Sequence, residues 1–223
     1  MYVQSLLLGS IGVLVETSDL QRQAFNTAFE AHGLKWQWDA DTYQSLLEVP
    51  GGKARIRYYG LARGVEVDVD ALYTAKIAAF EASLSNGVNL RPGIGPLMEA
   101  ARDRGIKIGF ATSTDPRQVD IILRASRPKL DASDFDFVGN RTWVQAVKPA
   151  PDIYHVALRE LGADAERTIA IEDTPESAQA AVAAGIRTFA YPNLYAQGRS
   201  FGIGVRVIER LGPSLLDPRA VAA

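Results

Sequence analysis

Three groups of residues that could bind a phosphoryl group stand at or just beyond the expected ends of buried strands. They are the hydroxyl pair Thr112-Ser113, the ammonium of Lys148 and the acidic pair Glu172-Asp173. Ligands of open parallel sheets bind beyond the carboxyl ends of the strands, so these side chains are expected to converge. Phosphoryl transfer needs charge neutralisation and accurate placement of the phosphoryl group, which these residue types can supply. The segment Gly9–Ile11, which follows the first strand, offers no ionisable side chain.

Each of these residues also has a purely structural interpretation. Thr112 could be a β-branched residue at a strand end, and Lys148, before Pro149, could be an exposed loop lysine. Glu172 and Asp173 could serve only to stabilise the amino end of the helix that follows them. Their spacing within one repeating pattern favours the functional interpretation.

That pattern is an alternation of strands and helices after residue 85. Apolar runs predict the strands, and amphipathic segments that open at Asp115-Pro116 or end at glycine predict the helices. The pattern predicts an α/β fold with a doubly wound parallel sheet. The expected strands are Leu6–Leu8, Ile106–Ala111, Phe135–Val138, Thr168–Ile171 and Arg187–Tyr191, and the expected helices are Gly93–Arg104, Pro116–Arg124, Pro151–Leu161 and Pro175–Ala184.

Residues 17–84 show only helical periodicity, with no strand. They predict a helical cap domain inserted after the first strand. The core domain is then discontinuous, made of residues 1–16 and 85–223. We expect the tail after Pro213 to fray.

Composition limits the kinds of partner. The net charge of −2 and the scattered basic residues indicate no nucleic-acid partner. The chain has no cysteine, which excludes thiolate chemistry and fits a reducing compartment. The apolar stretch Leu6–Val15 is too short and too broken by glycine to cross a membrane, so we expect a cytoplasmic protein with no membrane partner. The sequence sets no oligomeric state.

Four segments resemble the sequence motifs of the haloacid dehalogenase (HAD) superfamily: SLLLGSIGVLVET, ATST, VKPAPDIY and AIEDTPESAQAAVAAG. Three more, ETSDLQRQAFNTAFEAHGLKWQWD, GGKARI and LRPGI, are similar to the CbbY-type group. These are relatives of β-phosphoglucomutase whose members hydrolyse xylulose-1,5-bisphosphate, an inhibitor of Rubisco. The resemblance runs from Leu6 to about Tyr191 and implies a HAD-like core with an inserted helical cap.

The resemblance also implies site residues. The two aspartates of the first motif, the nucleophile and its acid/base partner, fall on Gly9 and Ile11, so both catalytic carboxylates are missing. Thr112, with Ser113, and Lys148 would hold phosphoryl oxygens. Mg²⁺, the family's cofactor, would be left with Asp173, Glu172 and the backbone carbonyl of Ile11, so its binding should be weak or absent. Lys148, having lost two anionic neighbours, should make the pocket more positive and better suited to bare anions.

The cap entry departs from the family as well. Ser18 and Gln21 stand where the family has Glu and His facing the substrate, and Pro50 stands where it often has Thr. The residues retained from the family are Gly51, Gly52, Lys53, Arg55 and Arg91, which contact substrate or only shape the structure.

Ser10 cannot replace the nucleophile if it continues the first strand, because its hydroxyl would then face away from the pocket. Three functions remain open. The first is an inactive pseudophosphatase that keeps binding of phosphate or a phosphorylated sugar. The second is an active phosphatase with divergent chemistry. The third is a protein-interaction module that uses the cap surface.

Overall fold

The computed structural model describes residues 2–49 and 51–217, so Pro50 lies outside the described residues. The chain divides into two compact units. One is formed by Met1–Glu16 together with Gly87–Ala223, and the other by Thr17–Asn86. We call them the core unit and the cap unit and describe each by itself.

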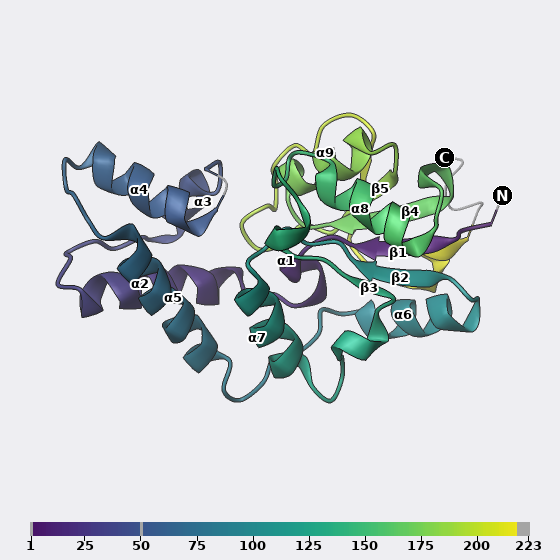
Figure 1. The fold of residues 1–223 in the computed structure, drawn as a ribbon, viewed down its shortest axis with the longest axis horizontal. Helices are drawn as coiled ribbons and strands as arrows, with labels where there is room; N and C mark the ends of the chain where they lie inside the picture. The colour runs from purple at the N-terminus through teal and green to yellow at the C-terminus, as the bar shows by residue number, and fades with distance from the viewer. Residues whose placement is uncertain (1, 50, 218–223) are drawn as a thin grey trace. The chain divides into compact units, whose positions relative to one another are not determined.

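The core unit is built on a six-stranded parallel sheet, in the order β3-β2-β1-β4-β5-β6. The predicted doubly wound α/β fold is confirmed. Helices α6 and α7 cover one face of the sheet, and α8 and α9 cover the other (Figure 1). The strands are β1 (Ser5–Leu8), β2 (Lys107–Phe110), β3 (Phe137–Val138), β4 (Thr168–Glu172), β5 (Arg187–Ala190) and β6 (Val205–Val207). The helices of this unit are α1 (Ile11–Leu14), α6 (Ile94–Asp103), α7 (Pro116–Ser126), α8 (Asp152–Leu161) and α9 (Pro175–Ala183), with 3-10 turns at Ala132–Asp134, Arg141–Trp143, Ala165–Arg167 and Pro213–Leu216.

Strand β1 is central, because it pairs with β2 on one side and with β4 on the other. Its three leucines, Leu6–Leu8, are completely buried. Neither face of such a strand meets solvent, so its residues do not alternate between polar and apolar, which accounts for the continuous apolar run. Leu8 lies beside Phe110 and Ile171, so the residues that follow these three meet at one edge of the sheet.

Local signals set the helix ends. The Asp115 side chain accepts a hydrogen bond from the Arg117 N–H at 2.9 Å, with Pro116 in the first turn of α7. Helix α8 ends at Gly162, whose φ of 59° is the left-handed conformation that glycine adopts readily.

Two expectations for the core unit need correction. Strand β6 was not predicted, because it is three residues long, partly exposed and flanked by a Gly-rich stretch. The fraying expected after Pro213 is wrong as far as Asp217, because Leu215 and Leu216 are buried in a 3-10 turn that packs near α6. Residues 218–223 lie outside the described residues.

All the regular secondary structure in the described residues of the cap unit is helical. Its helices are α2 (Ser18–Ala31), α3 (Ala40–Leu46), α4 (Gly52–Ala62) and α5 (Val69–Ser83). Asp39 and Asp68 cap α3 and α5 by accepting backbone N–H bonds. The unit's core is a cluster of aromatic rings around the buried Trp38, formed with Phe25, Phe29, Trp36, Tyr43 and Tyr59. No helix in the described part of the chain is both long and apolar enough to cross a membrane.

Candidate functional site

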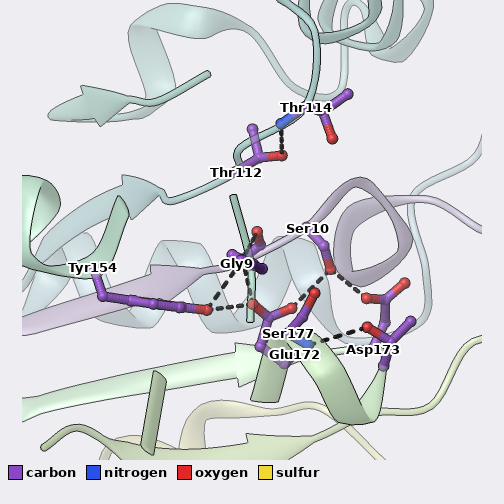
Figure 2. A network of polar contacts seen from close by, with 10 residues as sticks. Gly9, Ser10, Thr112, Thr114, Tyr154, Glu172, Asp173 and Ser177 are labelled. Atoms are coloured by element: carbon purple, nitrogen blue, oxygen red, sulfur yellow. Dashed lines mark hydrogen bonds and ion pairs between the residues drawn. The ribbon is translucent and has the colours of Figure 1, made fainter. Parts of the chain in front are cut away.

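The candidate site lies in the core unit, where the carboxyl ends of β1, β2 and β4 meet. The Gly9 N–H donates to the Ile171 carbonyl and the Ala111 N–H donates to the Leu8 carbonyl, each at 2.9 Å. These bonds hold the segments after the three strands side by side. Figure 2 shows Gly9, Thr112 and Glu172 at this edge of the sheet.

The space that a side chain at residue 9 would need is already filled. A Cβ atom added to Gly9 would lie closer than 3.0 Å to Glu172 Oε1 and Cδ and to the Tyr154 hydroxyl, separations that real Cβ atoms essentially never show. Glu172 is completely buried, and Tyr154 is too. The Glu172 head group therefore occupies the space where the resemblance would place the carboxylate of the first motif.

Lys148 is tied into the same network. Its ammonium donates to the Gly9 carbonyl at 2.6 Å, forms an ion pair with Glu172 Oε1 and lies 3.3 Å from the Tyr154 hydroxyl. Only 8% of Lys148 is exposed, so it is not the exposed loop lysine of the structural interpretation. Lys148 is paired with Glu172, and the site holds two carboxylates for one ammonium, so the expected shift toward positive potential relative to the family stays a prediction.

Ser10 faces the site, which corrects the expectation that it points away. Strand β1 ends at Leu8, and Ser10 is the residue before helix α1, so the alternation of a strand does not apply to it. Its Oγ lies 2.5 Å from Asp173 Oδ1 and 3.0 Å from Glu172 Oε2, and either carboxylate can accept its proton (Figure 2). The other oxygen of Asp173, Oδ2, accepts from the Asn193 amide at 2.7 Å.

These surroundings shift two pKa values. Burial, and then the neighbouring Glu172 carboxylate, raise the pKa of Asp173, while hydrogen bonds from Ser10 and Asn193 act in the opposite direction. Burial and the Glu172 charge raise the pKa of Tyr154 well above its usual value of 10.0. Tyr154 therefore remains a hydrogen-bond donor to Glu172 at neutral pH.

Thr112 and Ser113 lie in the loop after β2. Thr112 is buried, and its Oγ1 accepts a hydrogen bond from the Thr114 N–H at 3.2 Å. A hydroxyl that accepts in this way keeps its own proton for donation, as binding of a phosphoryl oxygen would require. Ser113 is half-buried.

Sequence reasoning missed Tyr154 and Asn193 as members of the site. Tyr154 lies six residues after Lys148 in the same motif, on the buried face of α8. Asn193 lies just beyond the end of β5, so the strand-end criterion that selected Thr112 would have found it.

Arg91 has a structural task in the core unit. Its guanidinium donates to the carbonyls of Gly12, Tyr191 and Pro192 at 2.8 to 2.9 Å and stacks 3.5 Å from the centre of the Tyr191 ring. These bonds join the segment after β1 to the segment after β5.

The other expected substrate residues belong to the cap unit. Ser18 begins α2, and the Gln21 side chain accepts a bond from the buried ammonium of Lys76. Arg55 donates its Nε–H to the carbonyls of Leu46 and Val49, which ties α4 to the turn before it.

The turn at the start of α4 contains the remaining retained residues. Gly51 has a φ of 92°, which favours glycine, and a Cβ on Gly52 would clash with the Tyr73 ring. Lys53 forms an exposed ion pair with Asp70 at 2.6 Å.

The residues present do not fit a Mg²⁺ site. Mg²⁺ prefers near-octahedral oxygen ligands and keeps several waters. Within the described residues, no group of three His, Asp or Glu side chains could hold a metal ion. Asp173 Oδ2 accepts from Asn193, Glu172 accepts from Lys148 and Tyr154, and the Ser10 hydroxyl donates to one or the other of the two carboxylates. The Ile11 carbonyl accepts the Val15 N–H at 2.9 Å.

Comparison with known proteins places this site in a family. The family model described as haloacid dehalogenase-like hydrolase matches residues 12–191. The chain belongs to this family. The match begins just after Gly9 and Ile11, the two positions on which the resemblance places the family's aspartates. HAD-like hydrolases generally use Mg²⁺.

Several of the similar proteins are CbbY proteins. The chain is 35% identical to Protein CbbY of Cereibacter sphaeroides, over 93% of this chain and 92% of that protein. It is also 35% identical to the plasmid-encoded Protein CbbY of Cupriavidus necator, over 94% of this chain and 86% of that protein. The resemblance to CbbY-type HAD phosphatases is therefore confirmed.

Solved structures agree. The crystal structure of CbbY from Rhodobacter sphaeroides in complex with phosphate has a TM-score of 0.88 at 32% identity and covers 99% of this chain and 100% of that chain. A mutant of the same protein, in complex with xylulose-(1,5)bisphosphate, has a TM-score of 0.84 at 34% identity, over 93% and 94% of the two chains.

Proposed function

We propose that this protein is a CbbY-like HAD homologue that binds a phosphorylated sugar without hydrolysing it. The observation that carries the proposal is the filled space at Gly9. The position where the family's nucleophile belongs has no side chain, and Glu172 and Tyr154 leave no room for one. Ile11 supplies no carboxylate for acid/base work either. Loss of such groups lowers the rate of an enzyme by several orders of magnitude.

Binding rests on different groups from hydrolysis. The Thr112 hydroxyl can donate to a phosphoryl oxygen, and the Lys148 ammonium can donate to one in place of the Gly9 carbonyl or the Tyr154 hydroxyl while it stays paired with Glu172. The CbbY structures in complex with phosphate and with xylulose-(1,5)bisphosphate support the choice of ligand class. Because the Glu172 charge offsets that of Lys148, we expect weaker binding of phosphate than an unpaired lysine would give.

Two assays on the purified protein test the proposal. In the first, phosphate release from xylulose-1,5-bisphosphate is followed with Mg²⁺ present and with a CbbY relative as the positive control, and we expect no turnover above background. Turnover that survives purification and disappears in Lys148→Ala contradicts the inactive state.

In the second assay, calorimetry compares xylulose-1,5-bisphosphate with unphosphorylated xylulose. We expect heat of binding only with the bisphosphate, and a loss of that heat in Lys148→Ala. Lys129→Ala is the matched control, since Lys129 is an exposed core-unit lysine bonded to the Asn89 side chain. If neither sugar binds, the proposal is wrong, and a protein-interaction module is favoured instead.

A second candidate function rests on Ser10. Its hydroxyl lies 2.5 Å from the buried carboxylate of Asp173, whose raised pKa favours acceptance of the proton while Oγ attacks phosphorus, and the same carboxyl would then have to pass that proton to the sugar oxygen as it leaves. The product would be a phosphoserine that water must then hydrolyse. One carboxyl would have to act both as base and as acid, because Ile11 supplies no second group, so this candidate is the weaker one. Mass spectrometry of protein incubated with the bisphosphate decides it, because a phosphoryl group on Ser10 that is absent from Ser10→Ala would establish it.

A further inference from the structure

The acidic pair at the end of β4 is hydrogen-bonded by side chains of the chain itself. Glu172 accepts from Lys148 and Tyr154, Asp173 Oδ2 accepts from Asn193, and the one Ser10 proton goes to either Asp173 Oδ1 or Glu172 Oε2. One of these partners is a cation. The Lys148 ammonium, with 7% of its side chain exposed, is ion-paired with the fully buried Glu172.

The Lys148 ammonium contacts two oxygens of the kinds that a divalent cation would use, a carboxylate oxygen and a backbone carbonyl. Its three neighbours are a carboxylate oxygen, a phenol oxygen and the Gly9 backbone carbonyl, which lies 2.6 Å from Nζ. A buried carboxylate needs a partner of opposite charge, and an ammonium with three donors meets that need without a metal.

A second cation at this position meets two obstacles. It would stand close to the Lys148 charge, where repulsion is weakly screened because the pair is buried. It would also have to compete with the partners of Asp173, which are the Asn193 amide at 2.7 Å from Oδ2 and the Ser10 hydroxyl at 2.5 Å from Oδ1.

We propose that Lys148 is the resident cation of this site, that its ammonium replaces Mg²⁺, and that the core unit folds and binds its ligand without a divalent metal. This goes beyond the proposed lack of hydrolysis, because a protein without a nucleophile could still bind Mg²⁺ between its remaining carboxylates.

The wild-type protein gives the first test. Differential scanning calorimetry compares the melting temperature in EDTA with that in about 1 mM Mg²⁺ or Mn²⁺, and we expect no shift, since a ligand stabilises only a state that it binds. Electron paramagnetic resonance of free Mn²⁺ should show no bound fraction at micromolar protein. A rise of several degrees, or micromolar binding of Mn²⁺, overturns the proposal.

Lys148→Met gives the second test. Removal of the ammonium leaves Glu172 without its counter-charge, so we expect Mn²⁺ affinity to rise by at least about tenfold. Lys129→Met, which removes an exposed lysine of the same unit, should leave Mn²⁺ affinity unchanged. Equal affinity in wild type and Lys148→Met overturns the proposal. If Lys148→Met does not fold, recovery of folding by added Mn²⁺ supports the proposal, and the wild-type measurements decide it without the variant.

The outcomes separate the two proposals. Tight Mn²⁺ binding without phosphate release contradicts the proposal of a metal-free site and leaves the proposed lack of hydrolysis standing. Phosphate release that persists in EDTA contradicts the proposed lack of hydrolysis and leaves the metal-free site standing.

Discussion

Replacing Gly9 with alanine tests whether the site has closed over its missing carboxylate. The added methyl group would fall inside the contact distance of the Glu172 carboxylate and the Tyr154 hydroxyl, both buried, so one of these groups must move. Overpacking of this kind costs about 1–3 kcal/mol. For a chain of this size each kcal/mol corresponds to about 2–4 °C, so we expect Gly9→Ala to melt roughly 2–12 °C lower.

The matched control is Gly95→Ala. Gly95 lies in helix α6, and no atom lies within 4 Å of a Cβ added there. Alanine in a helix is favoured over glycine by about 0.5–1 kcal/mol, so this variant should melt at the wild-type temperature or slightly above it. The assay is thermal unfolding followed by far-ultraviolet circular dichroism.

A double-mutant cycle identifies the group that the methyl displaces. Glu172→Asp shortens the side chain that meets the new Cβ, so the combination of Gly9→Ala with Glu172→Asp should be more stable than the sum of the two single effects, by about 0.5–3 kcal/mol. If Gly9→Ala melts like Gly95→Ala, the space at residue 9 is open, and the reasoning behind the inactive site is wrong.

Three further predictions follow from the same contacts. Because the pKa of Asp173 is raised, the folded protein holds a proton there above the unfolded-state value of 3.8, so the unfolding free energy should fall as the pH rises from 3.8 to the folded-state pKa. Melting temperatures measured over that range should show a flatter profile in Asp173→Asn. Arg91→Lys should lose some of the charge-assisted hydrogen bonds that Arg91 donates to three carbonyls, so its free energy of unfolding in urea should fall by about 1.5–3 kcal/mol. The control Arg102→Lys changes an exposed ion pair and should lower that free energy by at most about 1 kcal/mol. The pair Gly9→Asp and Ile11→Asp should restore at best weak release of phosphate from a generic ester, and turnover equal to that of a CbbY relative would contradict this.

The elements of the core unit were predictable wherever a local signal sets them. The apolar run Leu6–Leu8 and the capping pair Asp115-Pro116 predict their elements within a few residues, because burial on both faces and capping act locally. Strand β6 is different, because three partly exposed residues carry no periodicity that could distinguish a strand from a loop.

The sequence predicted which residues form the site better than it predicted how their side chains are arranged. Strand ends located Thr112 and Glu172, and the segment VKPAPDIY located Lys148, which lies well after the end of β3 at Val138. The direction of Ser10 depended on where β1 stops, because side chains alternate between the two faces only within the strand. The Glu172 head group beside Gly9 joins residues 163 apart in the chain, so no local pattern could show that the space was filled.

The central place of β1 has a consequence for how the protein is made. This strand leaves the ribosome first, yet its partner β4 lies roughly 160 residues later, which corresponds to about 10–30 s of synthesis. The cap unit is one continuous segment, so it can finish folding inside that interval. Both edges of Leu6–Leu8 are unpaired until β2 has been made, and one edge stays unpaired until β4 has been made, a state that pairs readily with other chains. The nascent chain is therefore most exposed to aggregation, and most in need of a chaperone, after the cap has folded and before β4 has emerged.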